Sequence, residues 1–110
     1  MSQSIRIVYR NFHGRLRANF NWAPISRLSA VLITAAEWGP GVLDPSLPLP
    51  GRPNLGEANV YVTNIGPHGD PGGEAGGVEF YVHADWSSPI NVVVTITVLG
   101  ECQEQLVENV

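Results

Sequence analysis

Two long runs of alternating apolar and polar residues near the C-terminal end constrain the fold of this chain most strongly. One run covers residues 77–86 and the other covers residues 90–99. Successive side chains of a β-strand point to opposite faces, so this period places the apolar residues of each run on one buried side. The sequence therefore predicts two long strands, joined as a hairpin by residues 87–89. The positions expected in the core are Val78, Phe80, Val82, Ala84, Trp86, Ile90, Val92, Val94, Ile96 and Val98.

The rest of the chain repeats this pattern over shorter stretches. Alternation over residues 5–10 and 15–22 predicts an N-terminal hairpin, and residues 58–65 form a further predicted strand. Residues 29–38 hold a β-branched cluster that favours a strand over the alternative, a short buried helix. Six to seven strands at fairly regular intervals predict one all-β domain over residues 1–110. We expect an antiparallel β-sandwich of jelly-roll or immunoglobulin-like form, with long Gly/Pro-rich loops.

Two such loops interrupt the predicted strands. Residues 39–57 exceed the usual loop length and hold five prolines. The leucines among them are expected to cover an open end of the core or, alternatively, to contact a partner. Residues 66–77 hold six glycines, which permit sharp turns. The leucines of the first loop are Leu43, Leu47, Leu49 and Leu55.

Composition argues against several classes of protein. The net charge of −4 argues against general affinity for nucleic acid. The single Cys102 excludes an intrachain disulfide and a multi-cysteine zinc site. No run approaches the roughly 20 apolar residues of a membrane-spanning helix. The first residues lack the apolar core of a signal peptide. We therefore expect a soluble protein, and its compartment stays unassigned.

The polar side chains of the glycine-rich loop and the strand after it form the first candidate site. The loop leads directly into the strand, where His83 and Asp85 point the same way. Loop carboxylates and carbonyls suit calcium, and paired histidines with a carboxylate suit zinc. The alternative is a solvated strand face beside a loop. The predicted ligand-binding residues are His68, Asp70, His83, Asp85 and Trp86, and the predicted ligands of a calcium ion are Asp70, Glu74 and Asp85.

Arginines form the second candidate site. Residues 1–27 hold five of the six basic residues and no acid. Arginine makes bidentate contacts to phosphate, sulfate and carboxylate groups. On the predicted N-terminal hairpin they would share one face, for an acidic glycan, a phospholipid head group or a nucleic-acid backbone. An ordinary polar face, or an ionic contact with another protomer, is the alternative. The predicted anion-binding residues are Arg6, Arg10, Arg15 and Arg17.

An enzymatic function is the least supported hypothesis for this sequence. Ser87 or Ser88, His83 and Asp85 are near one another in sequence, but the His83 and Asp85 side chains lie side by side on one strand face rather than facing each other. No Gly-X-Ser-X-Gly elbow is present. We therefore predict a non-enzymatic binding module that binds carbohydrate and acts as a homo-oligomer, with no cofactor unless calcium binds. One alternative is a structural or assembly protein whose basic N-terminal hairpin meets an acidic neighbour. The other alternative is a β-sandwich that binds lipid or membrane surfaces.

Overall fold

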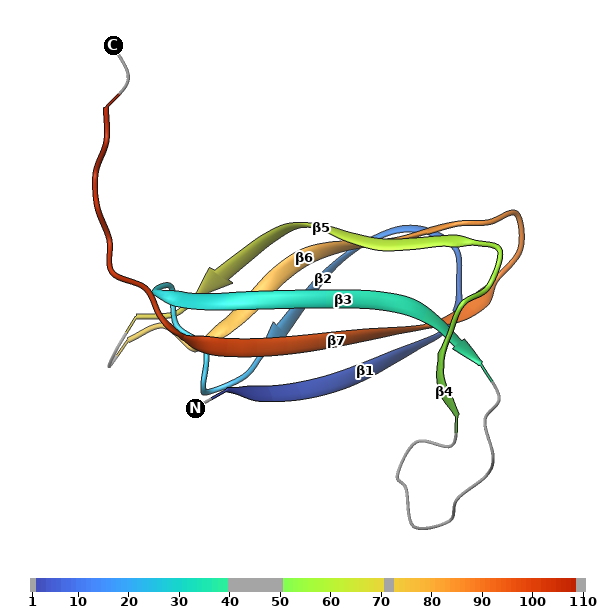
Figure 1. Ribbon diagram of the computed structural model, residues 1–110, viewed down its shortest axis with the longest axis horizontal. Helices are drawn as coiled ribbons and strands as arrows, with labels where there is room; N and C mark the ends of the chain where they lie inside the picture. The colour runs from blue at the N-terminus through green and yellow to red at the C-terminus, as the bar shows by residue number, and fades with distance from the viewer. Residues whose placement is uncertain (1, 40–50, 71–72, 109–110) are drawn as a thin grey trace.

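The computed structural model describes residues 2–39, 51–70 and 73–108. Two antiparallel sheets pack face to face, one of four strands in the order β1-β7-β3-β4 and one of three strands in the order β2-β6-β5 (Figure 1). This confirms the predicted all-β sandwich. The strands are β1 (Gln3–Phe12), β2 (Gly14–Asn21), β3 (Ser29–Gly39), β4 (Arg52–Asn54), β5 (Asn59–His68), β6 (Gly77–Asp85) and β7 (Ile90–Glu101).

The core lies between the two sheets and follows the predicted alternation. β6 is the middle strand of its sheet, and β7 lies between β1 and β3 in the other. Each strand turns one row of apolar side chains toward the other sheet, and Ile25 from the β2–β3 connection closes one end. Trp86 is an exception to the prediction, because 41% of it is exposed just beyond the end of β6. The buried rows are Val78, Phe80, Val82 and Ala84 of β6 and Val92, Val94, Ile96 and Val98 of β7.

Neither predicted hairpin exists. β6 pairs with β2 and β5, whereas β7 pairs with β1 and β3. The chain therefore crosses from one sheet to the other between β1 and β2, and again between β6 and β7 (Figure 1). The strands joined by each crossing turn their apolar rows toward the same core from opposite sides. Their sequences therefore alternate between apolar and polar residues in the same way as those of a hairpin. The basic N-terminal hairpin predicted from the sequence is wrong, because its two halves belong to different sheets.

Residues 29–38 form a strand, as predicted, within β3. β4 pairs with the end of β3, with Pro53 opposite Trp38. The predictions for Leu43, Leu47 and Leu49 lie outside the described residues. Leu55, the fourth leucine of that loop, is fully exposed.

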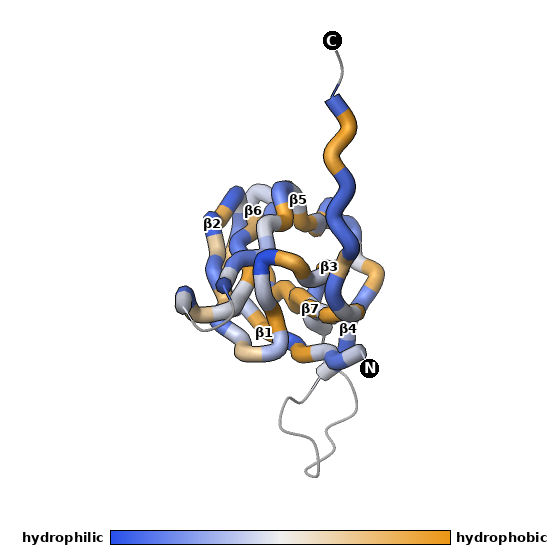
Figure 2. Tube along the Cα trace, turned by 90° about the vertical axis from the view of Figure 1, so that its left-hand side faces the viewer, coloured by the Kyte–Doolittle hydropathy of each residue, from blue (hydrophilic) through white to orange (hydrophobic). Residues whose placement is uncertain are grey.

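The end of the sandwich near the glycine-rich loop is tied together by backbone hydrogen bonds. The Trp22 amide donates to the Gly76 carbonyl at 2.8 Å, and the Arg27 amide donates to the Gly69 carbonyl at 2.8 Å. The Cys102 amide donates to the Leu28 carbonyl at 2.7 Å, and Glu104 pairs with Arg27 at 3.1 Å. The residues that follow, up to 108, project beyond both sheets (Figure 2). Within the part of the chain that the structure describes, no helix is long and apolar enough to cross a membrane.

Candidate functional site

The outward face of the three-stranded sheet gathers most of the chemistry-bearing side chains. The strand register places His83 of β6 between Arg15 of β2 and Tyr61 of β5. The next row places Tyr81 between Arg17 and Thr63. Residues directly opposite one another in a sheet share a face, so these rows form one surface. We call it the ring face, made of Arg15, Arg17, Asn59, Tyr61, Thr63, Glu79, Tyr81, His83 and Asp85.

Two contacts fix the imidazole of His83. Its ring stacks on that of Tyr61, with centroids 4.4 Å apart and planes 5° from parallel. Its Nε2 lies 2.8 Å from the Thr63 hydroxyl oxygen, a hydrogen bond whose donor depends on the histidine tautomer. The stack and the hydrogen bond together hold Tyr61 and His83 as one rigid unit across β5 and β6.

The Tyr81 ring continues this unit toward β2. It lies 6.3 Å from the His83 ring, centroid to centroid, and the planes are tilted by 58°. The Arg15 guanidinium carbon lies 4.7 Å from the centre of the Tyr81 ring, within cation–π range. Arg17 instead pairs with Glu79 at 3.1 Å. Aromatic and cationic groups therefore contact one another in sequence from β5 to β2.

The hydroxyl of Tyr61 has an environment that disfavours its ionisation. Desolvation raises the pKa of Tyr61 above its ordinary value, and a hydrogen bond to Asp85 and the charge of that carboxylate raise it further. The tyrosine nevertheless remains 41% exposed. Tyr61 thus offers solvent an aromatic surface with a protonated hydroxyl beside a carboxylate.

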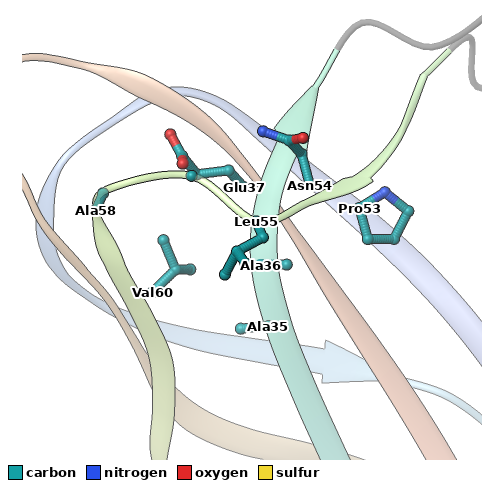
Figure 3. Close-up of a pocket in the computed structure, with 9 residues that line it drawn as sticks. Ala35, Ala36, Glu37, Pro53, Asn54, Leu55, Ala58 and Val60 are labelled. Carbon is teal, nitrogen blue, oxygen red and sulfur yellow. The ribbon is translucent and has the colours of Figure 1, made fainter.

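A groove adjoins the ring face along β5, and a second depression lies next to that groove. An open groove of about 500 Å³ is lined by Tyr61, Asn59 and Asp85, together with Leu55, Ala58 and Val60. A second depression of about 290 Å³ lies between β3, β4 and β5, and the two share Leu55, Ala58 and Val60. In Figure 3 the polar ends of Glu37 and Asn54 lie on one side of the second depression, with Ala35, Ala36 and Val60 on the other.

The structure does not bring the predicted ligand-binding residues together. His83 and Asp85 lie on the ring face, whereas His68 pairs with Gly77 at the other end of the same sheet. His83 lies six positions after Gly77 along β6, a distance of about 20 Å in a strand. The predicted grouping of the loop residues with His83 and Asp85 in one site is therefore wrong, because the loop lies at the opposite end of β5 and β6.

The loop residues have other partners. The two ring nitrogens of His68 lie 2.7 Å from the Asn19 side-chain oxygen and 3.0 Å from the Ala75 carbonyl. Glu74 lies 3.6 Å from the same imidazole. Asp70 pairs with Arg27 at 2.9 Å. These contacts hold the loop to β2 and to the β2–β3 connection.

The predicted calcium ligands are likewise apart. Asp70 and Glu74 lie at the glycine-rich end of the sheet, and Asp85 ends β6 at the opposite end. Among the described residues, no group of three or more histidines, cysteines or carboxylates is placed to hold a metal ion. The predicted set of Asp70, Glu74 and Asp85 is therefore not a shared coordination site.

The predicted anion-binding set divides between the two sheets. Arg15 and Arg17 lie on the ring face, and Arg6 and Arg10 lie on β1 in the other sheet. Tyr61 and Thr63 were not among the sequence-predicted site residues. Their alternation along β5 was visible, but only the register with His83 and Tyr81 shows that they complete the site.

Comparison of the chain with protein-family models, with curated proteins and with solved structures gives no match. The geometry of the ring face therefore carries the functional argument.

Proposed function

We propose that this chain is a non-enzymatic carbohydrate-binding module whose ring face binds a saccharide at Tyr61. One observation carries the proposal: a partly exposed aromatic ring forms the wall of an open groove beside Asp85 and Asn59. An aromatic ring offers an apolar surface on which the C–H face of a pyranose can stack. Carboxylate and amide groups accept and donate the hydrogen bonds of sugar hydroxyls. The groove volume of about 500 Å³ falls in the range of small-ligand sites.

Rigidity of the platform supports the same proposal. The ring of Tyr61 is stacked on His83, which is hydrogen-bonded to Thr63. A side chain that is already ordered loses little rotamer freedom when a ligand binds, so more of the interaction energy appears as affinity. The surface lies on paired strands rather than on a loop, which fixes the spacing of its groups.

A glycan array followed by calorimetric titration tests this function. Tyr61→Ala is expected to lower affinity for the best-binding glycan at least about tenfold, because the stacking surface is removed. Asp85→Asn is expected to weaken binding too, since the amide replaces one acceptor oxygen with a donor.

Trp86→Ala provides a matched control, because Trp86 and Tyr61 have the same exposed fraction of 41% and only Tyr61 lines the groove. Its affinity should equal that of the unchanged protein. Absence of binding to every glycan, with and without calcium, would overturn the proposal. Loss of binding in Trp86→Ala with retention in Tyr61→Ala would instead assign the site to Trp86, at the start of the β6–β7 connection.

Homo-oligomer formation, the assembly alternative and the lipid-binding alternative all stay predictions. The assembly alternative has lost its sequence basis, because β1 and β2 do not form the basic hairpin on which it rested.

A further inference from the structure

Arg15 and Arg17 are neighbouring arginines of the ring face, but only Arg17 has a carboxylate partner among the described residues. Arg17 is neutralised by Glu79 at 3.1 Å, and the same two residues line a shallow recess beside Tyr81. Arg15 instead lies over the Tyr81 ring at 4.7 Å. Within residues 2–39, 51–70 and 73–108, no carboxylate forms an ion pair with Arg15. Arg15 is therefore a cation that the ring face holds in place without neutralising it.

Arg15 lies within reach of a ligand bound at Tyr61. Arg15, His83 and Tyr61 occupy one row across the three strands. His83 covers one face of the Tyr61 ring, so a ligand stacks on the opposite face, beside the groove. Three neighbouring strands span about 10 Å, so a saccharide of several units that passes over the edges of the Tyr61 and His83 rings reaches Arg15. Stacking on an aromatic ring leaves the guanidinium edge free to donate two parallel hydrogen bonds to a carboxylate or sulfate.

Groups of opposite charge lie near Tyr61 and at the β2 end of this row. Asp85 belongs to β6, in the next row, and its carboxylate lies beside the Tyr61 hydroxyl, whereas Arg15 lies on β2. An anionic substituent is repelled at the first position and attracted at the second. A saccharide with one acidic group thus has one favoured direction across the sheet.

We propose that the ligand is an acidic saccharide, and that Arg15 binds its carboxylate or sulfate group while Tyr61 stacks on a sugar ring. This inference rests on the proposed carbohydrate-binding function and names its ligand class. Arg15 acts as a specificity residue: it adds affinity for the anionic group and leaves the contacts to the neutral part of the ligand unchanged.

The test compares neutral oligosaccharides with their uronate and their sulfated counterparts by calorimetric titration at low salt. We expect an acidic counterpart to bind about tenfold more tightly than the neutral sugar, as one charged hydrogen-bonded contact would give. Added sodium chloride should reduce that preference and leave neutral binding unchanged. The uronate and sulfate arms identify which anion Arg15 selects.

Arg15→Gln should lower binding of the acidic saccharide about tenfold and bring it to the level of the neutral one. Arg6→Gln is the matched control, because it removes the same charge from the other sheet and should keep the preference. Arg15→Lys keeps the charge but lacks the two parallel donors of a guanidinium, so it should retain only part of the preference for the acidic saccharide. Far-ultraviolet circular dichroism confirms that each variant is folded.

Equal binding of neutral and acidic saccharides would overturn this inference and leave the carbohydrate-binding function standing. A preference that survives in Arg15→Gln would overturn the assignment to Arg15. Failure of every saccharide to bind would overturn the proposed function itself, and the inference with it.

Discussion

The ring of Tyr61 is held by two neighbours that act on different parts of it. His83 covers one face of the ring at 4.4 Å, and Asp85 lies near the hydroxyl and raises its pKa in addition to the effect of desolvation. The remaining surface of the ring forms a wall of the open groove. The same residue thus provides an apolar stacking surface and a hydroxyl that stays protonated at neutral pH.

Alkaline titration tests this environment. In the folded protein Tyr61 should ionise above its ordinary pKa of 10.0, because desolvation and Asp85 both favour the neutral hydroxyl. Well below pH 10, Tyr61 is neutral in both the folded and the unfolded protein, and its contribution to stability does not change with pH. As pH rises above that value, the unfolded tyrosine ionises first, so the free energy of unfolding falls.

Ultraviolet difference absorbance of the phenolate measures the effect. Tyr61→Phe should remove one tyrosine that titrates late and should reduce the alkaline loss of stability. Tyr9, whose pKa burial also raises, still titrates late in this variant. The account is contradicted if the tyrosine lost in Tyr61→Phe is one that ionises at or below its ordinary pKa.

The connection between β5 and β6 packs tightly against the β2–β3 connection. The Gly76 carbonyl accepts a hydrogen bond from the Trp22 amide at 2.8 Å. A Cβ atom on Gly76 would overlap the carbonyl oxygen of Ile25, a residue that is only 2% exposed. Glycine is therefore required here for close approach of two backbones.

Gly76→Ala is expected to lower the free energy of unfolding by about 1–3 kcal/mol, because one of the two backbones must shift. Urea denaturation followed by circular dichroism measures the change. Gly73→Ala is the control, since its Cβ would meet its nearest neighbour, the Asp70 Cβ, at an ordinary 3.7 Å. Similar stability of the two variants would show that Gly76 is not tightly packed.

For the strands, the sequence predicts where the long ones lie along the chain but not which strands pair in a sheet. Alternation over residues 77–86 and 90–99 identified β6 and β7 and their core rows, except that Trp86 lies beyond the end of β6 and is 41% exposed. A strand that turns back beside its neighbour and one that crosses to the opposite sheet both bury the same alternate residues. The pattern therefore could not distinguish them, and both short connections were interpreted as hairpins. β4, with three residues, is too short for alternation to reveal.

The candidate site was only half predictable for the same reason. His83 and Asp85 were found because they lie together on one strand. Tyr61 and Arg15 join them through the register of β5 and β2, which no local pattern specifies. His68 and Asp70 were grouped with His83 because the loop adjoins the strand in sequence, although about 20 Å of extended chain separates them in space.

Across the whole molecule, the two sheets present chemically different outward faces. On the four-stranded sheet, the paired outward positions of β3 and β7 carry mainly threonine and aliphatic side chains. The ring face carries aromatic rings, arginines and carboxylates in contact with one another. The chain crosses to the three-stranded sheet after β1, leaves it after β2 and returns after β4, so Arg15 of β2 and His83 of β6 lie on the same sheet. That topology is what assembles the ring face. The outward residues of β3 and β7 include Leu32, Thr34, Ala36, Thr95 and Thr97, whereas Val93, on the same side of β7, is only 2% exposed.

A nuclear magnetic resonance titration with the tightest-binding saccharide from the glycan array tests the central claim, that the ring face is the ligand-binding surface. Amide shifts in the labelled protein should change at Asn59, Tyr61, His83 and Asp85, and at Arg15 when the saccharide is acidic. Outward residues of β3 and β7, such as Thr34 and Thr97, should remain unchanged. Shifts confined to the four-stranded sheet, or no shifts with any saccharide, would contradict the account.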